Sequence, residues 1–489
     1  MPGIITAFTH LWNPLGFPYG PSNDEGIYLR RAMHVLIGLG PQESLLYDHP
    51  YFAQLFLAGI FKIIGYPDSL GPSTGDLHSI ELLYLVPRIL MGILAVADTL
   101  LIYKIAEIRY NRNVAFIASI LFAVMPMTTW LLRRVWLEPI QLPFILSSIL
   151  FAVYYTKDSA VNHKNSIKNE NELEKKRRVL SILLSGVFLG LAIFTKIPAF
   201  TLIPLVGFLT YQTNDRNLKA IGLWLLPVIL IPLAWPMYAA YHGQFNLWLD
   251  GVLWQTHRGA QTLFYSLNYN FQIDPVLLLL GTAGLVFASV KRDLFLLLWT
   301  IPFLIFLYVI GFVSQWHFIP ILPVTCIAAA RLMEYLLHIT RNKKVRNVLT
   351  FIVVSGIAIF GLSSTAVMIT ASDNSSYFEA VMFLVQYLQD NSNITVISNP
   401  FYSWIPLHVF HLNNEYYVDY YNDMIPLYSG KALLTVDPLM SERITHHKAA
   451  KPIQEIHASN STKRVAVFGG DGSNKYDKND RVSIYLYER

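Results

Sequence analysis

Two adjacent carboxylates, Asp24 and Glu25, stand near the start of the chain in the stretch Ser22-Asn-Asp-Glu-Gly26, just after a run rich in Gly and Pro. A carboxylate can take the proton from a hydroxyl that attacks another group, so this pair is a candidate for general-base chemistry. Acidic residues beside a bilayer are rare and tend to be functional, and most of this chain is apolar. The alternative is a solvated acidic turn without chemistry. What separates the two interpretations is whether other polar residues converge on the pair.

The composition is that of a membrane protein with a soluble part. Of the 489 residues, 54% are hydrophobic and 14% are charged, and the mean hydropathy is +0.41, which is too apolar for an ordinary soluble domain. A membrane-spanning helix needs about 20 apolar residues. Ten runs approach that length: 82–104, 113–129, 137–155, 179–195, 197–212, 218–240, 275–290, 294–313, 318–338 and 348–370. The single cysteine, Cys326, lies within one of them, which excludes a disulfide framework and a Cys-based metal site.

The basic residues give the orientation of the chain. They concentrate in alternate loops between the apolar runs, and the positive-inside rule assigns these loops to the cytoplasm. They are Lys104, Arg109, Arg112, Lys157, Lys164, Lys168, Lys175 to Arg178, Arg216, Lys219, Lys291, Arg292, Arg341, Lys343, Lys344 and Arg346. Because this charge is spread over many loops and forms no stripe, we expect no nucleic-acid partner. The first 81 residues and everything after 371 then face outward, where the glycosylation sequons at Asn374, Asn393 and Asn460 would be usable.

The first outer segment contains apolar stretches that are too short to cross a bilayer. Residues 1–12 are either the end of a first transmembrane helix whose beginning is missing or an interfacial segment. The stretch 27–39 has the mixed pattern of a helix on the membrane surface. We expect 50–65 to be a second surface helix capped by Asp48. If 50–65 instead spanned the membrane, every later loop would change sides.

Beyond residue 371 the composition becomes polar and the periodicity changes. Short alternating stretches at 394–397, 432–436, 465–468 and 482–487, with helical patterns at 377–390 and 449–457, predict a small α/β domain. The fold class is therefore a polytopic α-helical membrane protein with surface helices on its outer face. We expect a transmembrane domain over 1–371, with the outer loop 13–81, and an extracytoplasmic α/β domain over 372–489.

This topology places a dispersed set of polar residues on one face of the membrane. The members lie in outer loops or at the outer ends of helices: Asp24, Glu25, Asp48, His49, Arg88, Arg133, Arg134, Glu138, Lys196, His257, Arg258 and His317. Carboxylates beside several cations suit a site that binds an anionic lipid head group and deprotonates a nucleophile. Interfacial anchoring explains Arg133 and Arg134 equally well, and each histidine taken singly suits a structural role better.

The order of these motifs resembles a known family. The acidic pair is followed by Asp48-His-Pro before a surface helix, Pro87-Arg88 in the next span, Arg133-x-x-x-x-Glu138, and Gly190-Leu-Ala-Ile-Phe-Thr-Lys196. Over roughly residues 20–340 the chain resembles the protein O-mannosyltransferase-like glycosyltransferases of the GT-C fold, which use polyprenyl-phosphate sugars. Each motif is short, and it is their order on one membrane face that makes the resemblance specific.

The resemblance implies a function and a set of roles. It implies transfer of a sugar, such as mannose, with inversion, from a dolichyl or polyprenyl phosphate to an acceptor on the outer face of the cell membrane. Asp24 corresponds to the proposed base, and Arg88 to the helix arginine. We expect Lys196, Arg134 and Arg133 to join Arg88 in binding the donor phosphate.

The remaining polar residues are candidates for acceptor binding or positioning: Asp48, His49, Glu138, His317, His257 and Arg258. Glu25 and Glu138 are also candidates to hold a divalent cation, Mg²⁺ or Mn²⁺, whose preferred ligands are carboxylate oxygens, although the sequence does not require a metal. The acceptor class stays open between a protein, a glycan and a lipid, with membrane lipids as surroundings.

Two other classes of protein are compatible with an apolar chain of this kind. A lipid-linked-sugar transporter or flippase would place ionisable groups near the middle of the membrane and show internal repeats, whereas these groups gather at one face. A surface receptor that binds through 372–489 would leave the outer Arg, Lys and Glu residues without a purpose.

Overall fold

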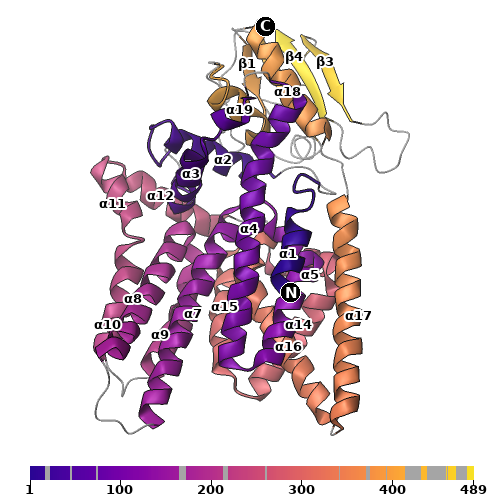
Figure 1. Cartoon of the computed structure of the whole chain (residues 1–489). Coiled ribbons are helices and arrows are strands. Elements are labelled where there is room, and N and C mark those ends of the chain that lie inside the picture. The colour runs from indigo at the N-terminus through magenta and orange to yellow at the C-terminus, as the bar shows by residue number, and fades with distance from the viewer. Residues whose placement is uncertain are drawn as a thin grey trace.

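The computed structural model describes residues 1–16, 22–43, 47–72, 75–164, 172–212, 218–258, 262–340, 342–370, 375–391, 394–412, 431–437, 459, 461–469 and 482–488. A bundle of apolar helices carries a small sheet with two short helices at one end (Figure 1). The helices α2 (Asn23–Leu36) and α3 (Phe52–Ile64) lie between the bundle and the sheet. We call this end of the bundle the α2 end.

All ten predicted apolar runs fall on helices. Within the described residues, five helical segments are long and apolar enough to cross a membrane alone. They lie on α4 (Leu77–Arg109), α7 (Leu137–Lys164), α8 (Glu172–Thr195), α16 (Leu322–Ile339) with the preceding η4 (Gln315–Ile321), and α17 (Lys343–Thr370). The number rises to eight if each of three bent pairs counts as one span.

The bent pairs show where regular spans give way to breaks. They are α5 (Arg112–Val124) with α6 (Pro126–Leu132), bent by 61°, α10 (Leu218–Leu230) with α11 (Ala234–Tyr241), bent by 41°, and α14 (Pro275–Val290) with α15 (Leu294–Ile310), bent by 120°. Proline causes the first break, because a residue before proline is pushed out of the helical region and Met125 is extended, with ψ 137°. A similar break follows α8, where Lys196 is extended before η3 (Ile197–Leu202) and α9 (Ile203–Gln212).

The first helix, α1 (Pro2–Leu11), has ten residues and packs into the bundle against α4 and α5. The hydroxyls of Thr6 and Thr99 lie 2.8 Å apart, and Thr9 donates to the carbonyl of Ala123 at 2.9 Å. A side-chain carbon added at Gly92 would lie 2.4 Å from a terminal methyl of Leu11 and 3.2 Å from the carbonyl oxygen of His10, so the small residue allows the two helices to approach closely. This segment therefore lies along α4 as a packed helix and not flat on the bundle's surface.

Both expected surface helices form, with two corrections. The acidic pair belongs to the first turn of α2, which begins at Asn23, and not to a loop before the helix. Carboxylates are favoured in that turn by the partial positive charge of the helix N-terminus. The N-cap position of α3 is Tyr51, so the expectation that Asp48 caps this helix is wrong. The carboxylate of Asp48 instead accepts from the backbone of His49 at 2.9 Å and pairs with Arg31.

The C-terminal sheet has the strand order β1-β2-β4-β3. The strands are β1 (Ile394–Ile397), β2 (Lys431–Val436), β3 (Thr462–Phe468) and β4 (Val482–Glu488), and only β1 and β2 are parallel among the described pairs. They coincide with the four predicted strands, and α18 (Ser375–Asp390) with the predicted helix 377–390. The other predicted helix, 449–457, and the three sequons lie outside the described residues. The domain boundary at 371 stays a prediction.

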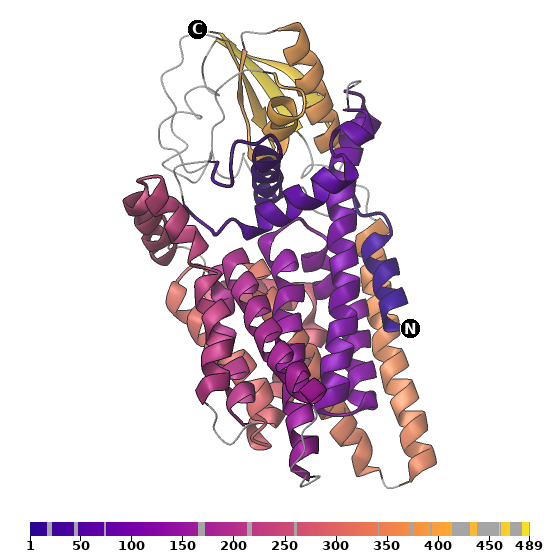
Figure 2. The same ribbon diagram turned by 60° about the vertical axis from the view of Figure 1, so that its left-hand side comes forward.

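A further helix, α19 (Pro400–His408), joins the C-terminal part to the α2 end. At Gly26 an added side-chain carbon would lie 2.4 Å from the backbone nitrogen of Phe401, so only glycine fits there. Tyr84 of α4 donates to the carbonyl of Phe401 and accepts from the indole of Trp404. The turn that carries the acidic pair therefore packs against α19. Figure 2 shows the indigo helix α2 between the bundle and the C-terminal sheet.

Candidate active site

The two acids of α2 have different environments. Successive residues of a helix point about 100° apart, so Glu25 faces into the protein with 0% exposure whereas Asp24 is partly exposed. Glu25 forms two bonds with Arg88 of α4, from Nε to Oε1 at 2.7 Å and from Nη2 to Oε2 at 2.8 Å. A bidentate, buried Arg–carboxylate pair is a strong and directional contact. Glu25 thus fixes Arg88, and Asp24 is the acid that solvent or a ligand can reach.

Two arginines hold the segment between α1 and α2. Arg88 donates to the carbonyls of Pro14 and Leu15 at 3.3 and 3.4 Å. Arg133, which follows α6, donates to the carbonyl of Trp12 at 2.8 Å and to that of Asn13. The guanidinium of Arg133 is buried in protein, which is not the environment of an anchor at the lipid–water interface.

Arg134 lies beside the Glu25–Arg88 pair and stacks on aromatic rings. Its guanidinium is 4.7 Å from the ring centre of Trp130 and 5.4 Å from that of Trp136, distances at which a cation is attracted to an indole face. Burial lowers the pKa of Arg134 to about 10, so the group stays cationic at neutral pH. Trp136 also donates to the hydroxyl of Ser22, which joins the loop after α6 to the start of α2.

A second buried ion pair connects α7 and the break after α8. Lys196 donates from Nζ to Oε1 of Glu138, and the side chains are 6% and 3% exposed. The position of Lys196 is fixed by Gln141, whose amide donates to its carbonyl and, at 2.8 Å, to that of Ala192. Gln141 was absent from the predicted site, and the available signal was a single amide within an apolar run.

The loop before α3 adds Asp48 and His49. Asp48 pairs with Arg31 of α2 at 2.9 Å. Burial lowers the pKa of His49 to about 3 against the opposing effect of the Asp48 carboxylate, and Lys196 and Arg31 lower it further. His49 is therefore neutral at physiological pH.

Tyr28 completes the α2 side of the site and was also not predicted. Burial raises the pKa of its phenol well above the ordinary value, and the nearby carboxylates of Asp24 and Glu138 raise it further. Asp24 and Glu138 are close enough for their charges to repel each other. The i, i+4 spacing of Asp24 and Tyr28 on one helix face is the sequence signal that could have identified the tyrosine.

Three predicted residues come from later segments. His317 accepts from the backbone of Ser314 at 2.9 Å and lies within electrostatic reach of Lys196 and His49. Arg258 lies 4.0 Å from the ring centre of Phe312 and acts on both histidines. His257 is exposed, and the contacts described for its ring are with Leu253 and Thr256 of its own helix. The structure thus brings together every predicted residue except His257.

The site consists of two adjoining groups at the α2 end. One group contains Glu25 and three arginines, and the other contains Asp24, Tyr28, Glu138, Lys196, His49, His317 and Arg258. Arg88 lies within α4, but every other cation or acid of the site lies at or beside the end of a helix or at a break between helices, where the regular lipid-facing pattern stops. Such an arrangement can bind an anionic group and remove a proton beside it.

Comparisons with known proteins place the chain in a class. It resembles the crystal structure of the oligosaccharyltransferase of Archaeoglobus fulgidus tethered with an acceptor peptide, with a TM-score of 0.58 and 12% identity over 97% of this chain and 72% of that one. It also resembles ArnT from Cupriavidus metallidurans bound to undecaprenyl phosphate, with a TM-score of 0.58 and 12% identity over 99% and 97% of the two chains. The protein is therefore a membrane protein with the GT-C glycosyltransferase fold.

Part of the chain also matches a known family of mannosyltransferases. Residues 42–242 match the family described as dolichyl-phosphate-mannose-protein mannosyltransferase. A search of curated proteins found no significant match. The resemblance predicted from the sequence is thus confirmed over this segment, which includes the Asp48-His-Pro motif, Arg88, Glu138 and Lys196.

A divalent metal was a candidate cofactor, and another structure of the same oligosaccharyltransferase contains zinc and sulfate. In the described part of this chain, no group of three or more His, Cys, Asp or Glu side chains is placed to hold a metal ion. Glu25 and Glu138, the expected ligands, each direct a carboxylate oxygen at a cation. No step of the chemistry below requires a metal.

Proposed function

We propose that the protein is an inverting glycosyltransferase. It moves a sugar, such as mannose, from a polyprenyl or dolichyl phosphate to an acceptor hydroxyl at the α2 end, on the extracytoplasmic face of the cell membrane. The observation that supports this most is the position of the partly exposed Asp24 between two carboxylates that hold buried cations. Asp24 is next in the chain to Glu25, which pairs with Arg88 and acts on Arg134, and it lies within electrostatic reach of Glu138, which pairs with Lys196. Structural neighbours in complex with dolichol-phosphate and with undecaprenyl phosphate support a lipid phosphate as the carrier.

In the proposed reaction Asp24 takes the proton of the acceptor hydroxyl. The acceptor oxygen attacks the anomeric carbon while the bond from that carbon to the phosphate oxygen breaks. The lipid phosphate leaves with the electron pair, and a single displacement inverts the anomeric configuration. Glycosidases need a second carboxyl to protonate a poor leaving group, whereas a phosphate leaves once its charge is stabilised.

The cations supply that stabilisation. Lys196 and Arg134 are proposed to contact the phosphate, whose negative charge grows as the bond breaks. The pairing with Glu138 keeps Lys196 oriented before the donor binds, and Glu25 does the same for Arg88. A buried charge with a prepared partner needs little reorganisation during the reaction.

The neutral side chains give the acceptor its surroundings. His49 and His317 lie within electrostatic reach of Lys196, and Tyr28 lies within reach of Asp24 and Glu138. All three side chains can donate hydrogen bonds to, or accept them from, sugar or acceptor hydroxyls. Protein, glycan and lipid hydroxyls are all compatible with these groups. The acceptor peptide in the archaeal neighbour favours testing a peptide first.

The experiment that tests this function uses the protein in proteoliposomes with dolichyl phosphate [³H]mannose and a Ser/Thr-rich peptide. We expect label in the peptide, in the configuration opposite to that of the donor. Asp24→Asn should abolish most of the label, and Asp250→Asn, which changes an exposed acid on the nearby α12 (Phe245–His257), should not. Movement of intact donor across the membrane without any labelled peptide, glycan or lipid would instead identify a transporter.

A further inference from the structure

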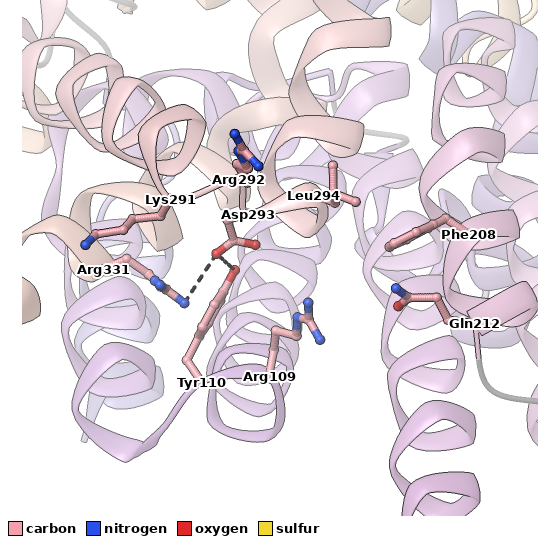
Figure 3. Close-up of a pocket in the computed structure, with 9 residues that line it drawn as sticks. All are labelled: Arg109, Tyr110, Phe208, Gln212, Lys291, Arg292, Asp293, Leu294 and Arg331. Atoms are coloured by element: carbon pink, nitrogen blue, oxygen red, sulfur yellow. Dashed lines mark hydrogen bonds and ion pairs between the residues drawn. The ribbon is translucent and has the colours of Figure 1, made fainter.

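A cavity of about 430 Å³ lies at the end of the bundle opposite the α2 end (Figure 3). It is lined by four basic residues, Arg109, Lys291, Arg292 and Arg331, and by one acid, Asp293. Arg109 ends α4, the helix that carries Arg88, and 21 positions separate the two arginines. At about 1.5 Å per residue the two sites are roughly 30 Å apart, which is the thickness of a bilayer core. The cavity plays no part in the proposed transfer reaction.

The charges around the cavity are held in place. Arg331 stacks on Tyr110, with 4.2 Å to the ring centre, and pairs with Asp293 at 3.3 Å. The phenol of Tyr110 donates to the same carboxylate oxygen at 2.9 Å. Figure 3 shows the guanidinium of Arg109 between this group and the opposite wall formed by Phe208 and Gln212. The single acid is already engaged, and the lining keeps an excess of positive charge.

Arg292 occupies a backbone position that favours glycine. It follows the C-cap residue Lys291 of α14, with φ 53° in the left-handed region, where helix ends most often carry glycine. A cation near a helix C-terminus is favourable, and the neighbouring Lys291 already supplies one. The interaction with the helix C-terminus therefore does not explain why an arginine occupies this strained position, and Arg292 adds a further positive charge to the cavity.

The cavity also has an apolar side that continues into the membrane. Phe208 of α9 and Leu294 of α15 line it, and Leu294 is 46% exposed. Further along α15, Ile301 and Ile305 are exposed as well. The positive-inside rule accounts for basic residues at this end, but not for their convergence on a concave site with an apolar exit.

We propose that this cavity binds the phosphate head group of an anionic membrane phospholipid, with the acyl chains along α9 and α15. Arg109 and Arg292 contact the phosphate, and Arg331 is oriented by Asp293 beside it. Basic pockets between helices are suited to such head groups. The lipid would fix the 120° turn between α14 and α15 against α4.

The test is native mass spectrometry of the full-length protein from micelles with equimolar phosphatidylglycerol and phosphatidylcholine. We expect preferential retention of phosphatidylglycerol. Arg109→Gln with Arg292→Gln should reduce it about 25-fold, at about fivefold per basic side chain. The matched control, Lys104→Gln with Arg112→Gln, removes two charges that pair with Glu107 at the same end, outside the cavity.

The outcomes separate the sources of the phosphate. Equal retention of both lipids, or equal loss in the two double variants, would overturn the site. Displacement of the lipid by millimolar inorganic phosphate, together with stabilisation of the protein by phosphate alone, would overturn the lipid and identify a free-phosphate site. If the double variant fails to fold, Arg109→Gln alone should reduce retention about fivefold.

Discussion

The division of labour between the two acids of α2 can be tested through protein stability. Glu25 is 0% exposed and makes two bonds of 2.7 and 2.8 Å to Arg88. The Glu25→Gln substitution keeps the shape of the side chain but leaves three neighbouring guanidinium groups, those of Arg88, Arg133 and Arg134, with one negative charge fewer. Breaking a buried ion pair by removing one partner costs about 3–5 kcal/mol, and we expect a loss of this size.

The assay is equilibrium unfolding in detergent micelles, followed by tryptophan fluorescence. Arg88→Met should cost a similar amount, and the double variant Glu25→Gln/Arg88→Met should cost less than the sum, with a coupling of at least about 1 kcal/mol, because the two residues are in contact. Asp24→Asn, on the partly exposed side of the same turn, should stay within about 0.5 kcal/mol of the wild type. A Glu25→Gln protein as stable as the wild type, or additive losses in the double variant, would refute the assignment of Glu25 to a fixed ion pair.

Three further predictions concern charge, pH and orientation. Lys196→Met should lower kcat/KM for the lipid phosphate donor by about 10- to 150-fold, since a hydrogen bond from a charged group is worth about 1.5–3 kcal/mol; unchanged donor kinetics would exclude Lys196 from the phosphate site. His49 has a folded pKa of about 3, below its unfolded value, so the unfolded chain binds a proton that the folded protein does not between about pH 3 and 6.5. Stability should therefore fall as the pH drops through this window. The unfolding midpoint of His49→Gln should fall less over the same pH range than that of the wild type. An equal dependence of the midpoint on pH in the two proteins would contradict the lowered pKa of buried His49. Cysteines placed at the exposed positions of His257 and Arg292 should react with an impermeant maleimide from opposite sides, against a low background because native Cys326 is buried, and labelling from one side would contradict the topology.

Most of the fold could be predicted from the length of the apolar runs and from the periodicity of apolar residues. Each predicted run became a helix because burial of apolar side chains and backbone hydrogen bonding inside a membrane leave few alternatives. The breaks inside apolar runs were harder to place. Met125 interrupts the predicted run 113–129, whose composition barely changes there, and proline, which causes this break, also occurs inside a regular helix, as Pro87 does in α4. The break at Lys196 was predicted, because this charged residue separates the runs 179–195 and 197–212.

The membrane face of the site could be predicted, but its pairings could not. Loop charges put Glu25, Arg88, Glu138 and Lys196 on one face, yet the sequence offers no rule that pairs residues 63 or 58 positions apart. Gln141 could not be predicted for the same reason, because its amide donates to the backbone carbonyls of Ala192 and Lys196, more than fifty positions away. For Asp48 the local rule for helix caps was overridden by the charge of Arg31 on a neighbouring helix.

The central claim is that Asp24 activates the acceptor for attack on a lipid phosphate sugar. The most direct measurement is the single-turnover rate of mannose transfer from dolichyl phosphate mannose by the wild type and by folded Asp24→Asn protein, in the same proteoliposomes. General-base catalysis contributes about 10²- to 10⁴-fold, so the variant should be at least about 100-fold slower while its stability is preserved. Near-normal transfer by Asp24→Asn would contradict the account, and so would the absence of any transfer by the wild type to peptide, glycan and lipid acceptors alike.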